Sequence, residues 1–193
     1  VEGYGMTEST GVIAVNRPDR PLVGTVGEPL GGIEVTLAED GEILTRGPHV
    51  FKGYFKNDEA TREAIDPEGW FHTGDVGYFD ADGFLYLCDR VKDMVISGGE
   101  NVYPAEVESV LYEHPAIAEV AVIGLPDQKW GEAVTAVVRL VPDSSLTLEE
   151  LRGFAAEKLA RYKLPLRLHF VDVMPRNPAG KVLKYQLREL LNT

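Results

Sequence analysis

The sequence predicts an α+β protein in which a β-rich, barrel-like subdomain is followed by a small α+β unit with a three-stranded sheet. Residues 1–90 contain short runs of alternating apolar residues that are separated by turn signals. Residues 94–193 alternate helical patterns with strongly β-branched runs. Because the hydrophobic fraction is 44% of 193 residues, the chain can bury a core. We place the boundary within Arg90–Asp93, which gives units 1–91 and 92–193.

Two hairpins and one short helix account for most of the first half. In "IEVTLAEDGEILTRG", alternating apolar positions flank a turn at Asp40 and Gly41, and "VGYFDADGFLYLCD" repeats the design around Asp80–Gly83. Between them, "NDEATREAI" begins with a capping residue, Asn57 or Asp58, and has the pattern of a short helix. These elements predict mostly antiparallel structure, in the form of a small barrel or a sandwich.

The second half contains three predicted strands and three predicted helices. Pro104 is well placed in the first turn of a helix over "AEVESVLYEH". Thr147 and Glu150 form a capping-box pair at the start of "TLEELRGFAAEKLA", and "KYQLRELL" predicts a terminal helix. The β-branched runs "IAEVAVIG" and "AVTAVVRL" predict two strands, and "RLHFV" predicts the third.

Composition limits the function classes that the chain fits. The net charge of −12 argues against a non-specific nucleic-acid or anionic-membrane surface, because the summed field would repel phosphate. No apolar run approaches the length that crosses a bilayer. The single cysteine, Cys88, permits no internal disulfide, so we expect a reducing, cytoplasmic environment. Since the chain opens at Val1 and not at Met, we expect it to be part of a longer protein.

The stretch "YGMTE" brings together side chains that suit a nucleotide. Tyr4 offers a flat face for a base, Gly5 lets a ligand approach the backbone, and Thr7 offers a hydroxyl to a phosphate oxygen. Glu8 can hold Mg²⁺, a hard cation that prefers carboxylate oxygen. On these residues alone, a turn with a surface carboxylate is an equally good interpretation.

Two further loops carry candidate polar groups. Asp75 in "GWFHTGDVG" can accept both hydroxyls of a ribose, or it can close an Asx turn. His72 in the same loop has no second ligand at metal-binding spacing, which favours a packed or exposed histidine. Lys181 in "NPAGKVLK" precedes a helix and can stabilise negative charge on a phosphate or a carboxylate, although a solvated lysine is the default interpretation.

Five segments, in order, resemble the adenylate-forming superfamily of enzymes, and more narrowly its acyl-CoA synthetases (carboxylate–CoA ligases). They cover essentially the whole chain and read "YGMTEST", "GEILTRGPHVFKGYFKN", "GWFHTGDVG", "DRVKDMVISGGENVYPAEVE" and "PRNPAGKVLK". The resemblance implies a reaction in two steps. A carboxylate, here a fatty acid or a related acid, attacks the α-phosphate of ATP and forms an acyl-adenylate and pyrophosphate. The thiol of CoA then takes the acyl group and releases AMP.

The resemblance assigns roles to residues on the nucleotide side. Tyr4 would stack on adenine, Thr7 would contact the α-phosphate, and Glu8 would hold Mg²⁺. Asp75 would bind the ribose hydroxyls, with Arg90 assisting. The cofactors that the resemblance implies are ATP, Mg²⁺ and coenzyme A.

The resemblance also assigns roles in the second half. Lys181 would be the catalytic lysine of the first step and would bridge the α-phosphate and the carboxylate. Lys92 and Asp93 would form the hinge about which a C-terminal lid rotates over a large domain. After rotation, Gly98 and Gly99 would line the tunnel for the pantetheine arm of CoA, a role that the resemblance favours over a simple turn.

The phosphate-gripping loop of such enzymes, which is rich in Ser, Thr and Gly, lies upstream of "YGMTE" and is absent from this sequence. We therefore expect residues 1–91 to be the end of the large domain and residues 92–193 to be the lid. The partner of both would be the upstream part of the same protein, and the isolated chain would not form an acyl-adenylate. Three alternatives stay open: an adenylation domain that loads a carrier protein, a non-catalytic binding module, and an oxidase that uses the same adenylate.

Overall fold

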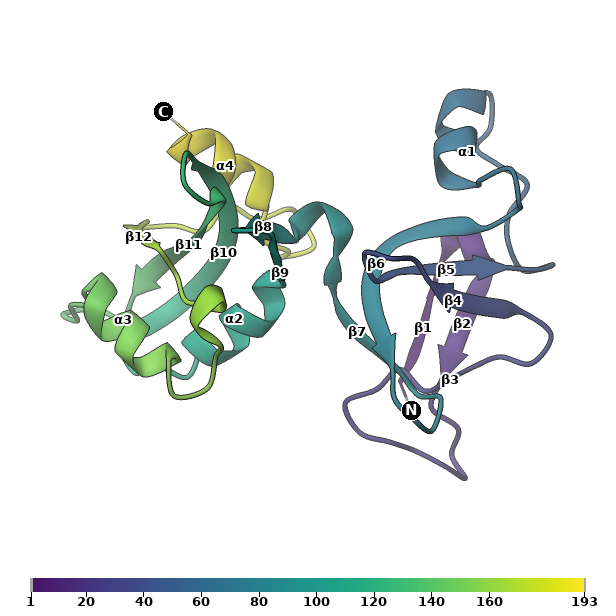
Figure 1. Ribbon diagram of the computed structural model, residues 1–193, viewed down its shortest axis with the longest axis horizontal. Helices are drawn as coiled ribbons and strands as arrows, with labels where there is room; N and C mark the ends of the chain where they lie inside the picture. The colour runs from purple at the N-terminus through teal and green to yellow at the C-terminus, as the bar shows by residue number, and fades with distance from the viewer. Residues whose placement is uncertain (1, 193) are drawn as a thin grey trace. The chain divides into compact units, whose positions relative to one another are not determined.

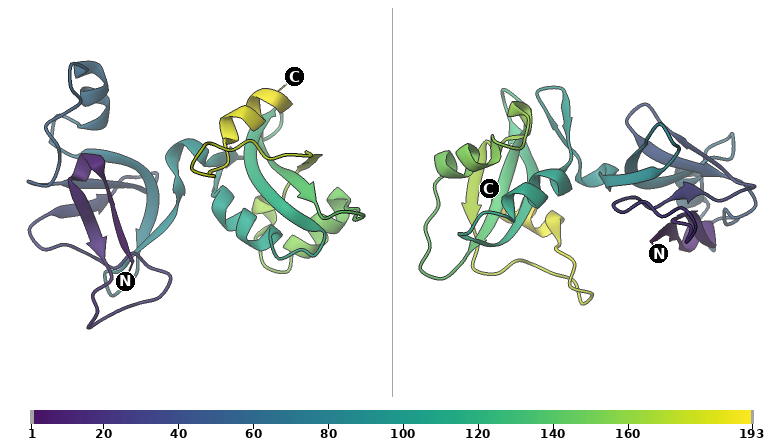
Figure 2. Two further views of the ribbon diagram at one scale, coloured as in Figure 1. Left: turned by 180° about the vertical axis from the view of Figure 1, so that it is seen from behind. Right: turned by 90° about the horizontal axis from the view of Figure 1, so that it is seen from below.

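A computed structural model describes residues 2–192 and divides the chain into two compact units, Val1–Val91 and Lys92–Thr193 (Figure 1). Strands dominate the first unit, and the second combines strands with helices, which confirms the α+β class. Figure 2 gives two further views in which each unit can be followed separately. No helix within residues 2–192 is long and apolar enough to cross a membrane.

Two antiparallel sheets build the first unit. One has the strand order β1-β2-β3, and the other has the order β4-β5-β6-β7. Both predicted hairpins are confirmed, as β4–β5 and β6–β7. The strands are β1 Gly3–Met6, β2 Gly11–Val15, β3 Glu28–Pro29, β4 Glu34–Leu37, β5 Glu42–Arg46, β6 Phe71–Phe79 and β7 Leu85–Arg90.

A shared apolar core holds these two sheets together. The backbone of Leu85 also joins them, because its N–H donates to Gly27 O at 2.8 Å and its carbonyl accepts from Val26 N at 2.9 Å. The two sheets therefore curl around one core as a half-barrel. The buried members of this core are Tyr4, Ile13, Ala14, Ile43 and Leu85.

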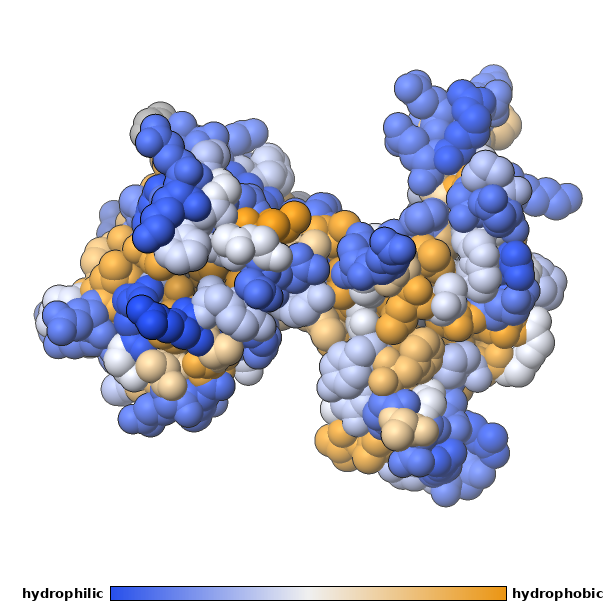
Figure 3. Space-filling model, viewed as in Figure 1, coloured by the Kyte–Doolittle hydropathy of each residue, from blue (hydrophilic) through white to orange (hydrophobic). Residues whose placement is uncertain are grey.

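Helix α1 (Asp58–Ala64) lies where the sequence predicts a short helix. Its cap is Asn57, whose side chain accepts from Ala60 N at 3.1 Å. None of the residues of α1 is buried, and Figure 3 shows hydrophilic side chains covering this helix on the visible face. The cap and the flanking chain hold α1 in place, because it has no apolar stripe to bury.

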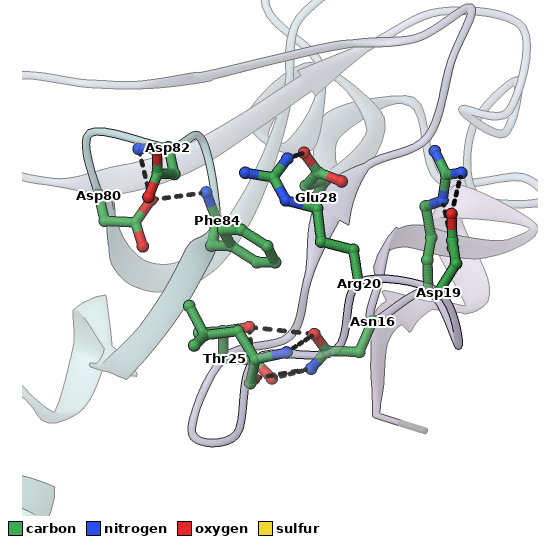
Figure 4. A network of polar contacts seen from close by, with 10 residues as sticks. Asn16, Asp19, Arg20, Thr25, Glu28, Asp80, Asp82 and Phe84 are labelled. Atoms are coloured by element: carbon green, nitrogen blue, oxygen red, sulfur yellow. Dashed lines mark hydrogen bonds and ion pairs between the residues drawn. The ribbon is translucent and has the colours of Figure 1, made fainter.

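A buried amide fixes the connection between β2 and β3. Asn16 is 4% exposed, and its side chain donates to the carbonyls of Leu22 and Thr25 and accepts from Leu22 N (Figure 4). The guanidinium of Arg20 lies over the Phe84 ring, 4.8 Å from its centroid. The connection thus satisfies its buried polar side chain within the unit, as such groups require.

A five-stranded sheet forms the centre of the second unit. Its order is β10-β11-β8-β9, and β12 pairs in parallel with β11. Helix α3 begins at the predicted capping box, in which Glu150 N donates to Thr147 Oγ1 at 3.2 Å. The elements are β8 Val95–Ser97, β9 Glu100–Val102, α2 Pro104–Leu111, β10 Ile117–Asp127, β11 Gly131–Leu140, α3 Leu148–Ala155, β12 Arg167–Phe170 and α4 Lys184–Leu191.

The predicted three-stranded sheet was wrong, because two short strands extend it to five. β8 and β9 pair as a hairpin of three-residue strands, and one residue pair, Ser97 with Gly131, joins β8 to β11. Three residues are too few for an alternating pattern to be recognised. The three longer strands of the sheet are those that the sequence predicts.

Helices cover both faces of this sheet, and each face has its own apolar cluster. The alternation of side chains along β10 decides which cluster a residue joins. Val120 and Val122 pack with α2 and α3, whereas Ala121 and Ile123 pack with Leu187 of α4. In Figure 1 these helices can be followed around the strands of the second unit.

Candidate functional site

Three of the residues predicted to bind the nucleotide meet in the first unit. Tyr4 in β1 donates its hydroxyl to Asp75 Oδ2 at 2.9 Å, and Arg90 Nε lies 3.4 Å from Asp75 Oδ1. Asp75 and Arg90 are register partners of β6 and β7, so the hairpin itself places them side by side. The Asp75 side chain is 19% exposed and that of Arg90 is 48% exposed. The carboxylate therefore lies at the edge of the core, held by a hydroxyl and accompanied by a guanidinium.

The ring of Tyr4 is part of the core and is 6% exposed. Burial raises the pKa of its hydroxyl well above the ordinary value, and the neighbouring Asp75 carboxylate adds to this rise. The hydroxyl therefore stays protonated and remains a donor to Asp75 at neutral pH. Stacking on adenine needs an accessible face of the ring, and this role of Tyr4 stays a prediction.

The turn η1 (Thr7–Ser9) follows β1 directly and carries the predicted phosphate and metal residues. Ser9 is 1% exposed and fixes the turn, because its Oγ accepts from Met6 N at 3.0 Å and lies 2.9 Å from Met6 O. Thr7 is exposed and Glu8 is half-buried. The turn thus presents both side chains just beyond the strand that holds Tyr4.

Glu8 has a partner that the sequence did not indicate. Tyr54 donates its hydroxyl to Glu8 Oε1 at 3.0 Å and so orients the carboxylate. Among residues 2–192, no group of three or more His, Cys, Asp or Glu side chains is arranged to hold a metal ion. One carboxylate still fits Mg²⁺, because Mg²⁺ at nucleotide sites takes one or two carboxylates and completes its shell with phosphate oxygens and water.

Backbone crowding is enough to explain why residue 5 is a glycine, without any role in ligand binding. A Cβ at this position would lie 1.8 Å from Gly11 O. The register of β1 and β2 shifts between Tyr4 and Gly5, which brings the two backbones close together at this point. The glycine is therefore needed for strand pairing.

Glu42 in β5 is a residue that the sequence reasoning missed. Its side chain is 13% exposed, Oε1 accepts from Gly74 N at 2.8 Å, and Oε2 lies 2.7 Å from His72 Nδ1. Because Gly74 precedes Asp75, Glu42 fixes the backbone that carries the candidate ribose ligand. The pairing of β5 with β6 creates this contact, so an isolated Glu in a strand gives no sign of it.

The predicted hinge residues lie in a single 3₁₀ turn, η2 (Val91–Asp93). Lys92 is exposed. Asp93 is 14% exposed, and its Oδ1 lies 3.4 Å from a guanidinium nitrogen of Arg188 in α4. Asp93 is therefore tied to the last helix of its own unit, and rotation about Lys92 and Asp93 stays a prediction.

Gly98 and Gly99 form the turn of the β8–β9 hairpin. Their φ angles are +63° and +86°, and Gly98 N donates to Trp130 O at 2.8 Å. Two successive positive φ angles are typical of the tight hairpin turns that favour glycine. Gly98 and Gly99 thus form a tight turn, and their contact with a pantetheine arm stays a prediction.

The two glycines offer a matched pair of substitutions. Gly99→Ala should cost about 1 kcal/mol, the strain of a left-handed residue with a side chain. Gly98→Ala should cost about 1–3 kcal/mol more, because its Cβ would also lie 2.8 Å from the Trp130 ring, whereas a Cβ at Gly99 meets open space. Thermal unfolding of the two variants beside the unaltered chain measures the difference. Equal destabilisation would contradict the packing of Gly98 against Trp130.

Lys181 is exposed and precedes α4, as the sequence predicts. Its N–H donates to Asn177 Oδ1 at 2.9 Å, and its carbonyl accepts from Asn177 N at 2.9 Å. Arg176 donates to Gly180 O at 2.6 Å. The backbone on both sides of Lys181 is therefore fixed, while the side chain remains in solvent.

A cavity of about 360 Å³ opens beside the glycine turn in the second unit. It presents two aromatic rings and two guanidinium groups. Aromatic faces and arginines together suit a ligand that carries a base and phosphates. The lining residues are Ser97, Trp130, Arg152, Arg161, Tyr162 and Leu166.

Comparisons with known proteins identify the family of this chain. Residues 1–55 match the family described as AMP-binding enzyme, and residues 106–181 match the AMP-binding enzyme C-terminal domain. The chain belongs to the adenylate-forming superfamily of AMP-binding enzymes, of which it represents the C-terminal portion.

Several relatives carry the names of CoA ligases or CoA synthetases. The 2-succinylbenzoate–CoA ligase of Geobacillus kaustophilus (strain HTA426) is 47% identical over 97% of this chain and 40% of the relative. The o-succinylbenzoate CoA synthetase of Bacillus subtilis, solved with its acyl-adenylate intermediate, is 41% identical with a TM-score of 0.83 over 97% of this chain and 40% of that one. The same enzyme with ATP and a magnesium ion gives a TM-score of 0.82 at 41% identity, over 96% and 40% of the two chains.

A relative with a different acid is also similar. The Mycobacterium tuberculosis fatty acyl CoA synthetase is 42% identical over 99% of this chain and 40% of that chain, with a TM-score of 0.65. The chain spans about 40% of the length of the relatives it matches.

Proposed function

We propose that this chain is part of an ATP-dependent carboxylate–CoA ligase, which forms an acyl-adenylate and then transfers the acyl group to CoA. The contact of Tyr4, Asp75 and Arg90 carries the proposal. It brings Tyr4 and Arg90 to the carboxylate of Asp75, so three residues of separate motifs meet at one place. Residues 1–91 then end the large nucleotide-binding domain, and residues 92–193 form its lid.

Asp75 is suited to bind the two ribose hydroxyls of ATP. Its two oxygens accept from Tyr4 and lie near Arg90, and a carboxylate has lone pairs for further donors. Thr7 and Glu8 follow on η1 and are assigned to the α-phosphate and to Mg²⁺. Mg²⁺, when bound, supplies positive charge to the phosphate oxygens. The orientation of the Glu8 carboxylate by Tyr54 supports this assignment.

Lys181 is assigned to the first chemical step. In this step a carboxylate approaches an α-phosphate, so two negatively charged groups meet. An ammonium held between them lowers the barrier through charge stabilisation and positioning. The fixed backbone around Lys181 supports this role, because it sets the point from which the long lysine side chain reaches the reacting groups.

CoA is assigned to the second unit. The thiol would reach the acyl group past the turn at Gly98 and Gly99. The cavity beside this turn has the aromatic rings and guanidinium groups that suit the nucleotide end of CoA. Trp130 links the two features, because it lines the cavity and packs against Gly98.

For the acid we propose 2-succinylbenzoate in place of the fatty acid that the sequence suggested. The proposal rests on similarity to the 2-succinylbenzoate–CoA ligase relatives, which reach 47% identity. A fatty acid is the alternative, since the fatty acyl CoA synthetase relative is 42% identical.

The proposal is tested on the full-length protein that contains this chain. Exchange of radiolabelled pyrophosphate into ATP, measured with 2-succinylbenzoate and with a long-chain fatty acid, should be strong with the former and at background with the latter. Adding CoA should then yield the thioester and AMP. Transfer to a carrier protein but not to CoA would move the protein to another branch of the superfamily. Nucleotide binding without exchange on any acid would contradict the enzyme assignment.

A further inference from the structure

An ionic network in the second unit reaches the loop that carries Lys181. Glu119 in β10 is 19% exposed and contacts two arginines at once. Its Oε1 accepts from Arg139 Nε at 2.6 Å, and its Oε2 pairs with Arg176. Arg139 belongs to β11, the neighbouring strand, whereas Arg176 belongs to the loop that leads to Lys181. One carboxylate of the sheet therefore holds a residue of the lysine loop.

Arg176 also forms a hydrogen bond with the residue before Lys181. One terminal nitrogen binds Glu119, and the other donates to Gly180 O at 2.6 Å. Arg176 also forms an antiparallel backbone bridge with Val182. Arg176 therefore contacts the residue before Lys181 and the residue after it. The contacts thus run from Glu119 in the sheet, through the guanidinium of Arg176, to the carbonyl of Gly180, which is bonded to the nitrogen of Lys181.

The network stays charged at neutral pH. The bond from Arg176 and then that from Arg139 hold the pKa of the Glu119 carboxyl below its ordinary value. The bond to Glu119 in turn raises the pKa of Arg176. Partly exposed ion pairs of this kind contribute little to stability. Their geometric effect is the more important one here, because a guanidinium fixes direction as well as charge.

The side chain of Arg176 lines a cavity that it could occupy in another conformation. The cavity measures about 340 Å³ and is lined by Glu119, Arg139, Asp172, Val173, Met174 and Arg176. Without Glu119 to hold it, the Arg176 side chain has room to swing away from Gly180. The loop would then lose one of the hydrogen bonds that fix the backbone next to Lys181.

We propose that Arg176 and Glu119 are positioning residues for Lys181, and that they act through the carbonyl of Gly180. The inference rests on the proposed function, in which Lys181 serves the adenylation step. A displacement of about 1 Å at a charge that bridges two reacting groups lowers the rate by up to about 100-fold. Removing Arg176 should therefore slow adenylation while leaving CoA transfer unaffected.

The test compares Arg176→Gln, Glu119→Gln and Arg139→Gln in the full-length protein. Arg139 is the matched control, because it shares Glu119 but, among the described residues, is not bonded to the lysine loop. We expect kcat of adenylation to fall about 10- to 100-fold in Arg176→Gln and less in Glu119→Gln, with KM for ATP unchanged. Arg139→Gln should stay within about twofold of the unaltered enzyme. Thioester formation from supplied acyl-adenylate should be the same in all three variants.

A double-mutant cycle separates positioning from general damage. In a Lys181→Ala background, Arg176→Gln should have no further effect on adenylation, because its effect passes through Lys181. Additive losses, an equal fall in both half-reactions, or an Arg139→Gln variant as slow as Arg176→Gln would overturn the inference. An active enzyme in which Arg176→Gln is silent would overturn it while leaving the proposed function intact. An unaltered enzyme without pyrophosphate exchange would overturn both.

Discussion

Replacing Lys181 by alanine should lower the rate of acyl-adenylate formation by about 100- to 1,000-fold in the full-length protein, while thioester formation from supplied acyl-adenylate stays nearly unchanged. The split is expected because the two steps differ in charge. The first brings two anions together, whereas the second breaks a mixed anhydride that already exists. Pyrophosphate exchange measures the first step, and release of AMP from the acyl-adenylate in the presence of CoA measures the second.

Two further variants make the Lys181 result specific. Lys158→Ala removes another exposed ammonium of the same unit, one that pairs with Glu113, and should leave both steps within about twofold. Lys181→Arg keeps the charge but changes its shape and reach, so it should recover only part of the lost rate. Equal loss of both half-reactions in Lys181→Ala would count against its assignment to the first step.

Replacing Asp75 by asparagine should raise KM for ATP by about 10- to 100-fold. A hydrogen bond to a charged group contributes about 1.5–3 kcal/mol, and each 1.4 kcal/mol is a factor of ten in affinity. The substitution also leaves Arg90 without its carboxylate and places an amide opposite the Tyr4 hydroxyl. Steady-state kinetics with saturating acid give the change.

A ribose analogue turns this result into a test of the contact itself. The unaltered enzyme should prefer ATP to 2′-deoxy-ATP, and Asp75→Asn should largely lose that preference, because its carboxylate is the proposed partner of the hydroxyl. Tyr4→Phe is the matched control, since it keeps the buried ring and removes only the donor to Asp75. It should weaken ATP binding less than Asp75→Asn. An equal loss for both nucleotides in Asp75→Asn would indicate a purely structural role.

Local patterns in the sequence were enough to predict the longer elements. Residues only a few positions apart in the sequence determine four of these features: the hairpins β4–β5 and β6–β7, the cap of α1 at Asn57 and the capping box of α3. The β8–β9 hairpin was not counted in the predicted sheet, because its strands are three residues long and the glycine pair carries most of its signal. Its place in the sheet depends on one contact with Gly131, which no local pattern records.

The candidate site was predictable as a set of residues but not as an arrangement. Family motifs name Tyr4, Asp75 and Arg90, whereas the register of β6 with β7 decides that the last two touch. Glu42 was missed because its contacts with Gly74 and His72 depend on strand pairing across β5 and β6. The bond from Tyr54 to Glu8 joins residues far apart in sequence, and no spacing rule predicts it.

The order of the elements, in which α4 follows β10 after β11, α3 and β12, has a consequence for synthesis on the ribosome. One face of the central sheet, which includes Ile123 and Leu125 of β10, packs against Met174 and against Leu187 of α4. Arg188 of the same helix also reaches back to Asp93. Until α4 has been synthesised, this apolar face lacks the cover of Leu187, and Asp93 lacks the guanidinium of Arg188. The second unit can therefore reach its finished form only once α4 has left the ribosome, and a stop codon before α4 would leave an exposed apolar face that favours aggregation.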